Sequence, residues 1–167
     1  MCHILVDVCC VFSSKICLKP VGYVQTDAVG KEVNNKTVVS KIVFNEKYTE
    51  ALDGLKDFSH LFVLFWFHEL SEKNPKNMKT HPCGRDDMPL VGLFATCTPY
   101  RPNSIGLTRV KLLDVQNNVI TVQGLDAFNG TPVLDIKPFD HYEKTSDFKI
   151  ADWWKQILKE RKKKENI

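Results

Sequence analysis

Polar residues that could bind a ligand gather in three short segments of the sequence. The first runs from Thr96 to Leu107 and places Arg101 and Asn103 beside two prolines. Proline fixes the backbone angle φ, and arginine presents a planar, permanently charged fork that suits a carboxylate or a phosphate. The segment therefore predicts either a ligand-binding loop or a structural turn between strands.

The second segment, residues 124–138, surrounds the dipeptide Asn129-Gly130, which is a strong signal for a tight turn. Asp126 and Asp135 flank this turn. Turn amides and a carboxylate together could hold the base edge and ribose hydroxyls of a nucleoside. The alternative is a plain hairpin in which Asp135 and Lys137 pair on one face of a strand.

The third segment is Phe67-His68-Glu69, which follows a continuous apolar run that begins at His60. Such a run predicts a strand buried on both faces, near the middle of a sheet. Polar residues at the end of a buried strand commonly face the mouth of a pocket. A simple solvated strand exit explains the same pattern, so both interpretations stay open.

Composition limits the class of protein. The 167 residues are enough for one domain with its own core, and 43% hydrophobic with 26% charged residues is typical of globular proteins. A net charge of +3 permits a nucleic-acid partner without requiring one. Positive charge is concentrated in residues 155–164, where six basic residues stand against the single Glu160, and this segment forms either a solvated tail or a phosphate-binding surface. Residues 1–18 are too short and interrupted for a membrane span, so no membrane association is expected.

Six cysteines are present, and four of them lie in the first 17 residues: Cys2, Cys9, Cys10, Cys17, Cys83 and Cys97. No CxxC pair occurs, which argues against a zinc site of standard spacing. A secreted disulfide framework is not expected either, so we predict a cytoplasmic protein. Residues 1–17 are interpreted as a poorly ordered extension or as residues upstream of the natural start. An extra edge strand, or a metal or redox role for these cysteines, is the alternative.

The remaining chain predicts a mostly β protein, a small closed barrel over residues 18–140, followed by a C-terminal helix and basic tail over residues 141–167. Short β-type runs bounded by Gly, Pro and Asn indicate this barrel. A short helix after the second strand is expected at residues 46–55, and an amphipathic helix at 150–161. The expected strands are residues 21–26, 38–44, 60–68, 90–96, 107–115, 119–122 and 132–136.

Residues 92–107 and 124–138 are similar to two signatures of the TsaA-like family, the first of which is typically G-x-F-A-T-R-x-P-x-R-P-N-P-I-G. Residues 57–61 and the apolar strand after them resemble a third. This resemblance implies a small β-barrel that forms a homodimer and uses S-adenosyl-L-methionine. It also implies methylation of the exocyclic N6 nitrogen of a threonylcarbamoyl-modified adenosine next to the anticodon of tRNA, with the anticodon loop as partner.

The resemblance also implies site residues. Arg101 and Asn103 are expected to orient substrate or cofactor, with Asp126 as the third catalytic candidate. The expected cofactor contacts are Asn35, Lys36, Thr37, His68, Glu69, Cys97, Leu107, Ala127, Phe128, Asn129 and Gly130. Direct displacement of a sulfonium methyl group needs alignment more than a catalytic base, which agrees with the lack of an acid–base cluster in the sequence. No metal is expected.

The sequence departs from the family pattern at three positions. Cys97 stands where the signature has Arg, Ser104 replaces a Pro, and Cys83 replaces the Arg of a His-Pro-Arg-Gly pattern. The first change removes a positive charge that could hold a carboxylate or phosphate. Arg85 or Arg101 could supply it instead. The alternatives are a non-catalytic S-adenosylmethionine- or RNA-binding module and a methyltransferase with a different substrate.

Overall fold

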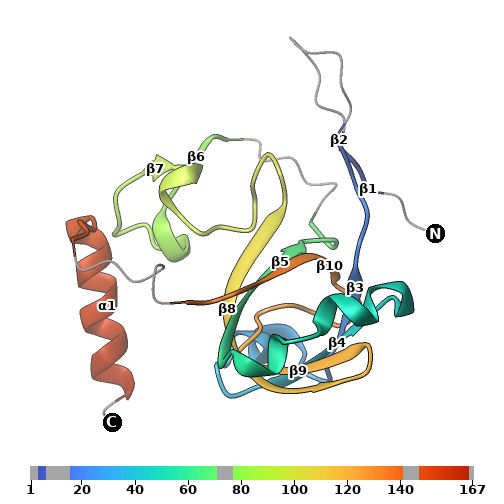
Figure 1. The fold of residues 1–167 in the computed structure, drawn as a ribbon. Coiled ribbons are helices and arrows are strands. Elements are labelled where there is room, and N and C mark those ends of the chain that lie inside the picture. Colours follow the sequence, from blue (N-terminus) through green and yellow to red (C-terminus); the bar gives the residue numbers. More distant parts are fainter. Residues whose placement is uncertain (1–3, 7–15, 71–76, 141–146, 166–167) are drawn as a thin grey trace.

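A closed six-stranded barrel forms the centre of the molecule (Figure 1). The computed structural model describes residues 4–6, 16–70, 77–140 and 147–165. Around the barrel the strands follow the order β10-β3-β4-β9-β8-β5, and every neighbouring pair is antiparallel. Their bounds are Gly22–Gln25 for β3, Val39–Phe44 for β4, His60–Trp66 for β5, Ile105–Gln116 for β8, Val119–Gln123 for β9 and Pro132–Pro138 for β10. The predicted closed barrel is confirmed.

The barrel core follows from the alternation of side chains along each strand. In β8, every second residue from Gly106 to Val110 is buried, while the residues between them are exposed. The buried side chains of all six strands meet in one cluster, with Ile42, Leu61 and Ile120 fully enclosed. Burial of such apolar area is the main stabilising contribution, at roughly 1.5–3 kcal/mol per large side chain.

The apolar strand β5 is less buried than its sequence predicts. It pairs with β8 on one side and β10 on the other, but its outward residues, including Phe62, are only half-buried. Phe139, just beyond β10, packs edge-on against Phe62 with ring centroids 5.4 Å apart. A barrel gives each strand one core face, and the chain after β10 partly covers the other, which accounts for the continuous apolar run.

Short 3-10 helices connect the barrel strands. The helix expected after the second barrel strand is present as η2 (Glu46–Leu52) and η3 (Leu55–Asp57), separated by Gly54 in the left-handed region at φ 78°. The Asn45 side chain accepts a hydrogen bond from the Lys47 amide at the start of η2. A further 3-10 helix, η1 (Gly30–Asn34), lies between β3 and β4 and was not predicted.

The strand expected at residues 90–96 is mostly absent. Only β7 (Val91–Gly92) is a strand, paired with β6 (Lys79–Thr80), and the chain then turns into the 3-10 helix η5 (Leu93–Ala95). Leu93 is buried, whereas Phe94 is 80% exposed, so this segment lacks the alternation of a barrel strand. Another 3-10 turn, η4 (Pro82–Gly84), lies between β6 and β7.

The C-terminal helix α1 (Asp152–Glu165) lies to one side of the barrel, beside the segment that contains β6 and β7 (Figure 1). Ile157 is its buried apolar residue, at 3% exposure. Glu160 forms an ion pair with Arg85, which directly connects α1 to the chain after η4. The predicted helix is thus confirmed. None of the helices within the described residues has the length and hydrophobicity required to cross a bilayer.

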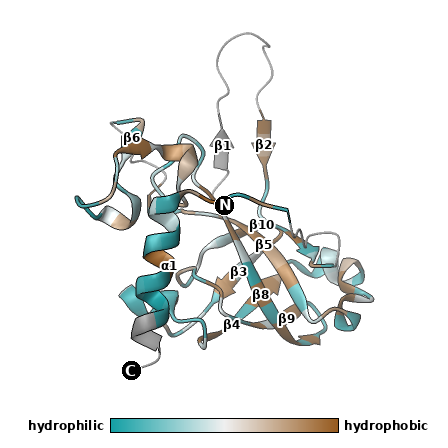
Figure 2. Cartoon of the chain, turned by 90° about the vertical axis from the view of Figure 1, so that its left-hand side faces the viewer, coloured by the Kyte–Doolittle hydropathy of each residue, from teal (hydrophilic) through white to brown (hydrophobic). Residues whose placement is uncertain are grey.

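The N-terminal region forms a two-stranded sheet of its own. β1 (Ile4–Val6) pairs antiparallel with β2 (Ile16–Leu18), and β2 projects from the barrel (Figure 2). These strands therefore do not extend a barrel edge. Cys2, Cys9 and Cys10 lie outside the described residues, so a metal or redox role for them stays a prediction.

Candidate active site

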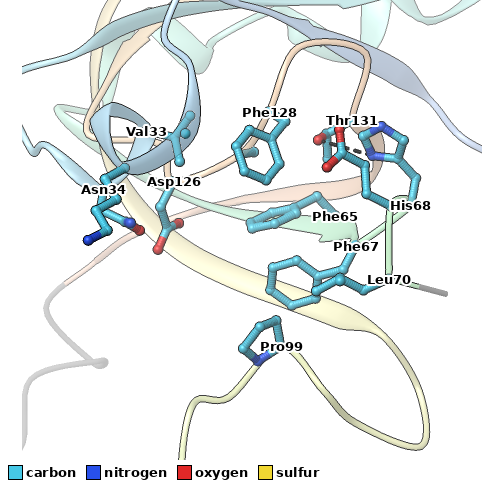
Figure 3. Close-up of a pocket in the computed structure, with 14 residues that line it drawn as sticks. Val33, Asn34, Phe65, Phe67, His68, Leu70, Pro99, Asp126, Phe128 and Thr131 are labelled. Carbon is cyan, nitrogen blue, oxygen red and sulfur yellow. Dashed lines mark hydrogen bonds between the residues drawn. The ribbon is translucent and has the colours of Figure 1, made fainter. Parts of the chain in front are cut away.

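A cavity of about 230 Å³ opens where η1, the end of β5 and residues 126–131 meet. Most of its wall is apolar or aromatic (Figure 3). We call it the aromatic cavity. The residues that line it are Gly30, Lys31, Val33, Asn34, Phe65, Phe67, His68, Glu69, Leu70, Pro99, Asp126, Ala127, Phe128 and Thr131.

Three phenylalanine rings define this cavity. Figure 3 shows Phe128, Phe65 and Phe67 one below another, with Pro99 beyond the last ring. Phe65 and Phe67 meet edge-on, with centroids 5.2 Å apart, and Phe65 is only 1% exposed, so its ring is held by the core. Flat apolar faces of this kind suit the stacking of a nucleobase.

One end of the aromatic cavity is polar. The buried hydroxyl group of Thr131 lies 3.4 Å from Nδ1 of His68, and Figure 3 shows the two side chains facing each other. Glu69 follows His68 at the rim and is exposed. The cavity therefore offers both hydrogen-bonding groups and a carboxylate beside its aromatic wall.

Asp126 stands between this cavity and a second one. Its carboxylate accepts a hydrogen bond from the Thr108 hydroxyl, and Thr108 is buried on β8. Gly124, with φ 86°, turns the chain inward after β9 and thereby directs Asp126 to this place. Asn34 and Pro99 also border both cavities, so the two spaces share one wall.

The second cavity is larger, about 800 Å³, and more polar. We call it the polar cavity. Residues from η1, η4, the loop after η5 and α1 surround it: Asn34, Lys36, Thr80, His81, Pro82, Cys83, Gly84, Thr96, Cys97, Thr98, Pro99, Tyr100, Asp126, Trp153, Trp154 and Arg161. Its wall combines three large aromatic side chains with two cations, Lys36 and Arg161.

Arg101 stabilises the loop beside the polar cavity rather than lining it. Its Nη1 donates to the carbonyl oxygens of Thr96 and Thr98, at 2.8 Å and 3.4 Å, and its guanidinium lies over the Phe94 ring. The loop it braces carries Cys97 and Tyr100 to the cavity wall. Asn103 is exposed outside both cavities, and its carbonyl oxygen accepts from the Ile105 amide.

The structure brings about half of the sequence-predicted site residues to the two cavities. His68, Glu69, Ala127 and Phe128 line the aromatic cavity, Lys36 and Cys97 line the polar cavity, and Asp126 lines both. The others, which line neither, are Asn35, Thr37, Arg101, Asn103, Leu107, Asn129 and Gly130. Leu107 lies on the outer face of β8 and is 62% exposed.

The Asn129-Gly130 turn serves the barrel. The Gly130 amide donates to the Val24 carbonyl at 2.8 Å, and the Asn129 side chain accepts from the Thr26 amide at 3.2 Å. The turn is thereby fastened to β3. It does not close a hairpin, because β10 pairs with β3 and β5 while β9 pairs with β4 and β8. The hairpin is therefore wrong, but the expected pairing on one strand is present, since Nζ of Lys137 lies 2.7 Å from Oδ2 of Asp135 on β10.

Asn35 and Thr37 are engaged with each other. The Asn35 carboxamide oxygen accepts from both the amide and the hydroxyl of Thr37, at 3.0 Å and 2.9 Å. This local turn carries Lys36 to the polar cavity, where its Nζ also donates to the Gly124 carbonyl at 3.4 Å. Of these three residues, the lysine is therefore the one that the structure places to meet a ligand.

Arg85 is not available as a cation for the polar cavity. Its guanidinium binds Asp87, with Nε 3.0 Å from Oδ1, and also Glu160 of α1. The hydrogen bonds from Arg85 hold the pKa of both carboxyl groups below its ordinary range, and the pKa of Arg85 itself is raised, first by Asp87 and then by Glu160. Neither Arg85 nor Arg101 replaces the charge missing at Cys97, which corrects the expectation from sequence.

Several site residues were missed by sequence reasoning. Asn34 belongs to the unpredicted η1, and Phe65 was assigned only to a buried strand. Trp153, Trp154 and Arg161 lie on α1, far from the signature segments in sequence. The two tryptophans were visible as part of an apolar helix stripe, but no local signal places that stripe against the loop around Cys97.

The fold is a closed antiparallel barrel, and its aromatic cavity lies beside the larger polar cavity. A domain of this class can hold two ligands against one shared wall. The sequence comparison supplies the particular family. Residues 25–145 match the family model of the tRNA-methyltransferase O N-terminal domain. That match covers most of the chain, and the chain therefore belongs to this family, which confirms the resemblance seen in the sequence.

Relatives and solved structures agree with this assignment. A probable S-adenosyl-L-methionine-binding protein of Methanocaldococcus jannaschii is 44% identical over 123 residues, which cover 73% of this chain and 90% of that protein. The tRNA (adenine(37)-N6)-methyltransferase of Rattus norvegicus is 42% identical over 60% of this chain, but the match spans only 23% of the rat protein. A crystal structure of TrmO from Pseudomonas aeruginosa superimposes with a TM-score of 0.65 at 26% identity, covering 87% of this chain and 63% of that one.

Proposed function

We propose that this protein transfers a methyl group from S-adenosyl-L-methionine to the N6 nitrogen of an adenosine next to the anticodon of tRNA. Membership of the tRNA-methyltransferase O family supports this proposal, as do the names of the relatives that bind the cofactor or methylate adenine 37. The chain spans only part of the rat enzyme and of the solved TrmO chain. We propose in addition that the adenosine carries a threonylcarbamoyl group when it is methylated.

The aromatic cavity fits the cofactor chemically. Phe67 and Phe128 offer stacking faces for adenine, and the carboxylates of Glu69 and Asp126 suit ribose hydroxyls and a positively charged sulfonium. When bound, S-adenosylmethionine supplies an electrophilic methyl group. The Thr108 hydroxyl fixes the orientation of the Asp126 carboxylate, so that this charge is in place before any ligand arrives.

The polar cavity fits the acceptor nucleotide. The anticodon loop is single-stranded, so a base can leave its stack and be held by aromatic side chains. Tyr100 and the two tryptophans of α1 supply those side chains, and Lys36 and Arg161 supply positive charge. The residues would position the adenine amino nitrogen and exclude water, a role that can provide much of the rate enhancement without a dedicated base.

The observation that carries the proposal is the wall shared by the two cavities. Asn34, Pro99 and Asp126 border both spaces, so a ligand in each would meet at this wall. A group-transfer reaction requires such a meeting point between donor and acceptor. A module that binds only one ligand has no need for it.

We further propose a homodimer and a cytoplasmic location. The outer face of β8 and the segment before it expose large apolar side chains, with Phe94 at 80% and Leu107 at 62%, and exposed apolar surface is typical of interaction sites. Leu107 lines neither cavity, so it could contact a cofactor only if a second subunit packed against this face. Sedimentation analysis would refute the dimer if the protein remained monomeric at micromolar concentration.

The thiols of Cys17, Cys83 and Cys97 are free, as expected in a reducing compartment.

A transfer assay tests the central proposal against the binding module. Purified protein is incubated with S-adenosylmethionine carrying a labelled methyl group and with tRNA bearing threonylcarbamoyl-adenosine, and the nucleosides are then identified by mass spectrometry. We expect one labelled methyl on that adenosine. Cofactor binding without transfer to this tRNA, or to total tRNA, would favour the module, and transfer at another nucleoside would identify a different substrate.

A further inference from the structure

The helix α1 contributes three side chains to the polar cavity: Trp153, Trp154 and Arg161. None of them lies within residues 25–145, the part of the chain that matches the family model. They are also absent from the lining of the aromatic cavity. One side of the polar cavity is therefore built by an element that lies outside the part of the chain matched by the family model, and that element does not line the proposed cofactor pocket.

Arg161 is held on an aromatic surface. Its guanidinium carbon lies 5.6 Å from the centre of the Trp154 ring, and its Nη2 donates to Sγ of Cys83 at 3.7 Å. Within the described residues, no carboxylate forms an ion pair with it. A guanidinium that rests on an indole retains donors in its own plane, which suits a carboxylate or phosphate oxygen.

The other arginines of this region are already occupied. Arg85 is bound by Asp87 and Glu160, and Arg101 by two backbone carbonyls. Within the described residues, Arg161 is thus the guanidinium that lines the polar cavity, whose wall also includes Cys97. Arg161 of α1 therefore places a positive charge in the cavity whose wall has Cys97 in place of the family arginine.

The position of α1 is fixed independently of any ligand. Ile157 is buried, and the Arg85–Glu160 ion pair joins the helix to the segment after η4, which itself borders the polar cavity. Gln156 also donates to Glu160 at 3.2 Å and so orients that carboxylate toward its partner. The recognition side chains consequently face the cavity from a helix that is packed against the rest of the chain.

We propose that α1 is an acceptor-recognition element, in which Arg161 binds an anionic group of the acceptor nucleotide beside the stacking faces of Trp153 and Trp154. The inference deepens the proposed function and rests on it for the identity of the acceptor. The anionic group is either the carboxylate of the threonylcarbamoyl substituent or a backbone phosphate. Both take the same planar pair of donors.

The test is equilibrium binding of an anticodon stem-loop RNA, measured by fluorescence anisotropy, so that it does not depend on catalysis. The variant is Arg161→Gln, and the matched control is Lys159→Gln, which removes one exposed charge from the same helix without touching the cavity. We expect Arg161→Gln to weaken binding about tenfold or more. Lys159→Gln should weaken it less than about threefold, and calorimetry should give both variants the wild-type affinity for S-adenosylmethionine.

Two RNAs distinguish the sources of the anion. If Arg161 binds the substituent carboxylate, its loss weakens only the stem-loop that carries threonylcarbamoyl-adenosine. If it binds a phosphate, the loss is equal for the stem-loop with plain adenosine. Equal effects of the two variants on both RNAs would overturn the inference. Such a result leaves the proposed methyl transfer standing, whereas wild-type protein that binds the stem-loop through Arg161 but transfers no methyl would refute the proposed function alone.

Discussion

Gly106 controls the position of the Phe65 ring, and replacing it with alanine tests how the barrel builds the aromatic cavity. Gly106 lies opposite Phe65 in the β5–β8 ladder. A Cβ atom at this position would stand 2.4 Å from both Cε2 and Cζ of the ring, which is far inside van der Waals contact. Since Phe65 is 1% exposed and also lines the cavity, the ring can yield only by disturbing the core or the cavity.

Overpacking of this kind typically costs about 1–3 kcal/mol. In a domain of this size, each kcal/mol lowers the melting temperature by about 2–4 °C, so Gly106→Ala should melt about 2–12 °C below wild type. The displaced ring should also weaken S-adenosylmethionine binding, measured by calorimetry. Phe65→Leu, added to Gly106→Ala, makes room for the new methyl group and should recover part of the lost stability.

Gly92→Ala is the matched control. No atom lies within 4 Å of a Cβ built at Gly92, and its φ of −62° is open to any residue. This variant should keep both the melting temperature and the cofactor affinity of wild type. The reasoning is refuted if Gly106→Ala behaves like Gly92→Ala in both measurements.

Three further predictions follow from named contacts. Thr108→Val removes the hydroxyl that orients Asp126 and should weaken cofactor binding about tenfold by calorimetry, whereas Thr108→Ser should not; equal affinities would contradict the role of this hydrogen bond. Phe128→Leu, at a ring that is 38% exposed, should weaken cofactor binding while leaving the melting temperature nearly unchanged, and an unaltered affinity would exclude stacking there. The pKa of Glu160 is lowered by its hydrogen bond to Arg85, so the contribution of this ion pair to the attachment of α1 is fully present above the ordinary pKa of a glutamate, about 4.3, and is lost as the pH falls through the lower folded-state value. Tryptophan fluorescence should therefore shift on acidification, Glu160→Gln should show the shift at neutral pH, and a variant with the wild-type pH profile would disprove this attachment.

Much of the barrel could be predicted because its strands follow a local rule. The alternating burial along β8 and β9 follows from the alternation of residue types in the sequence, and Asn129-Gly130 predicts the turn that precedes β10. The segment 90–96 was mispredicted because its apolar residues have the composition of a strand. The burial of Leu93 beside the largely exposed Phe94 is set by the tertiary structure, which local propensity does not encode.

The candidate site was predicted only where signature residues face the cavities themselves. Asp126 and Phe128 do so, whereas Asn129 forms a hydrogen bond that fastens its turn to β3. A motif therefore identifies a loop more reliably than it assigns roles within that loop. Arg161 could not have been found in this way, because its place depends on how α1 packs, through an ion pair between residues 75 positions apart.

The most direct test of this account is a crystal structure of the protein with S-adenosylhomocysteine, the product that remains after methyl transfer. We predict that its adenine stacks in the aromatic cavity against the rings of Phe67 and Phe128, and that its sulfur atom lies at the wall formed by Asn34, Pro99 and Asp126. A nucleoside bound in the polar cavity instead, or a sulfur atom directed away from that wall, would contradict the arrangement of donor and acceptor described here.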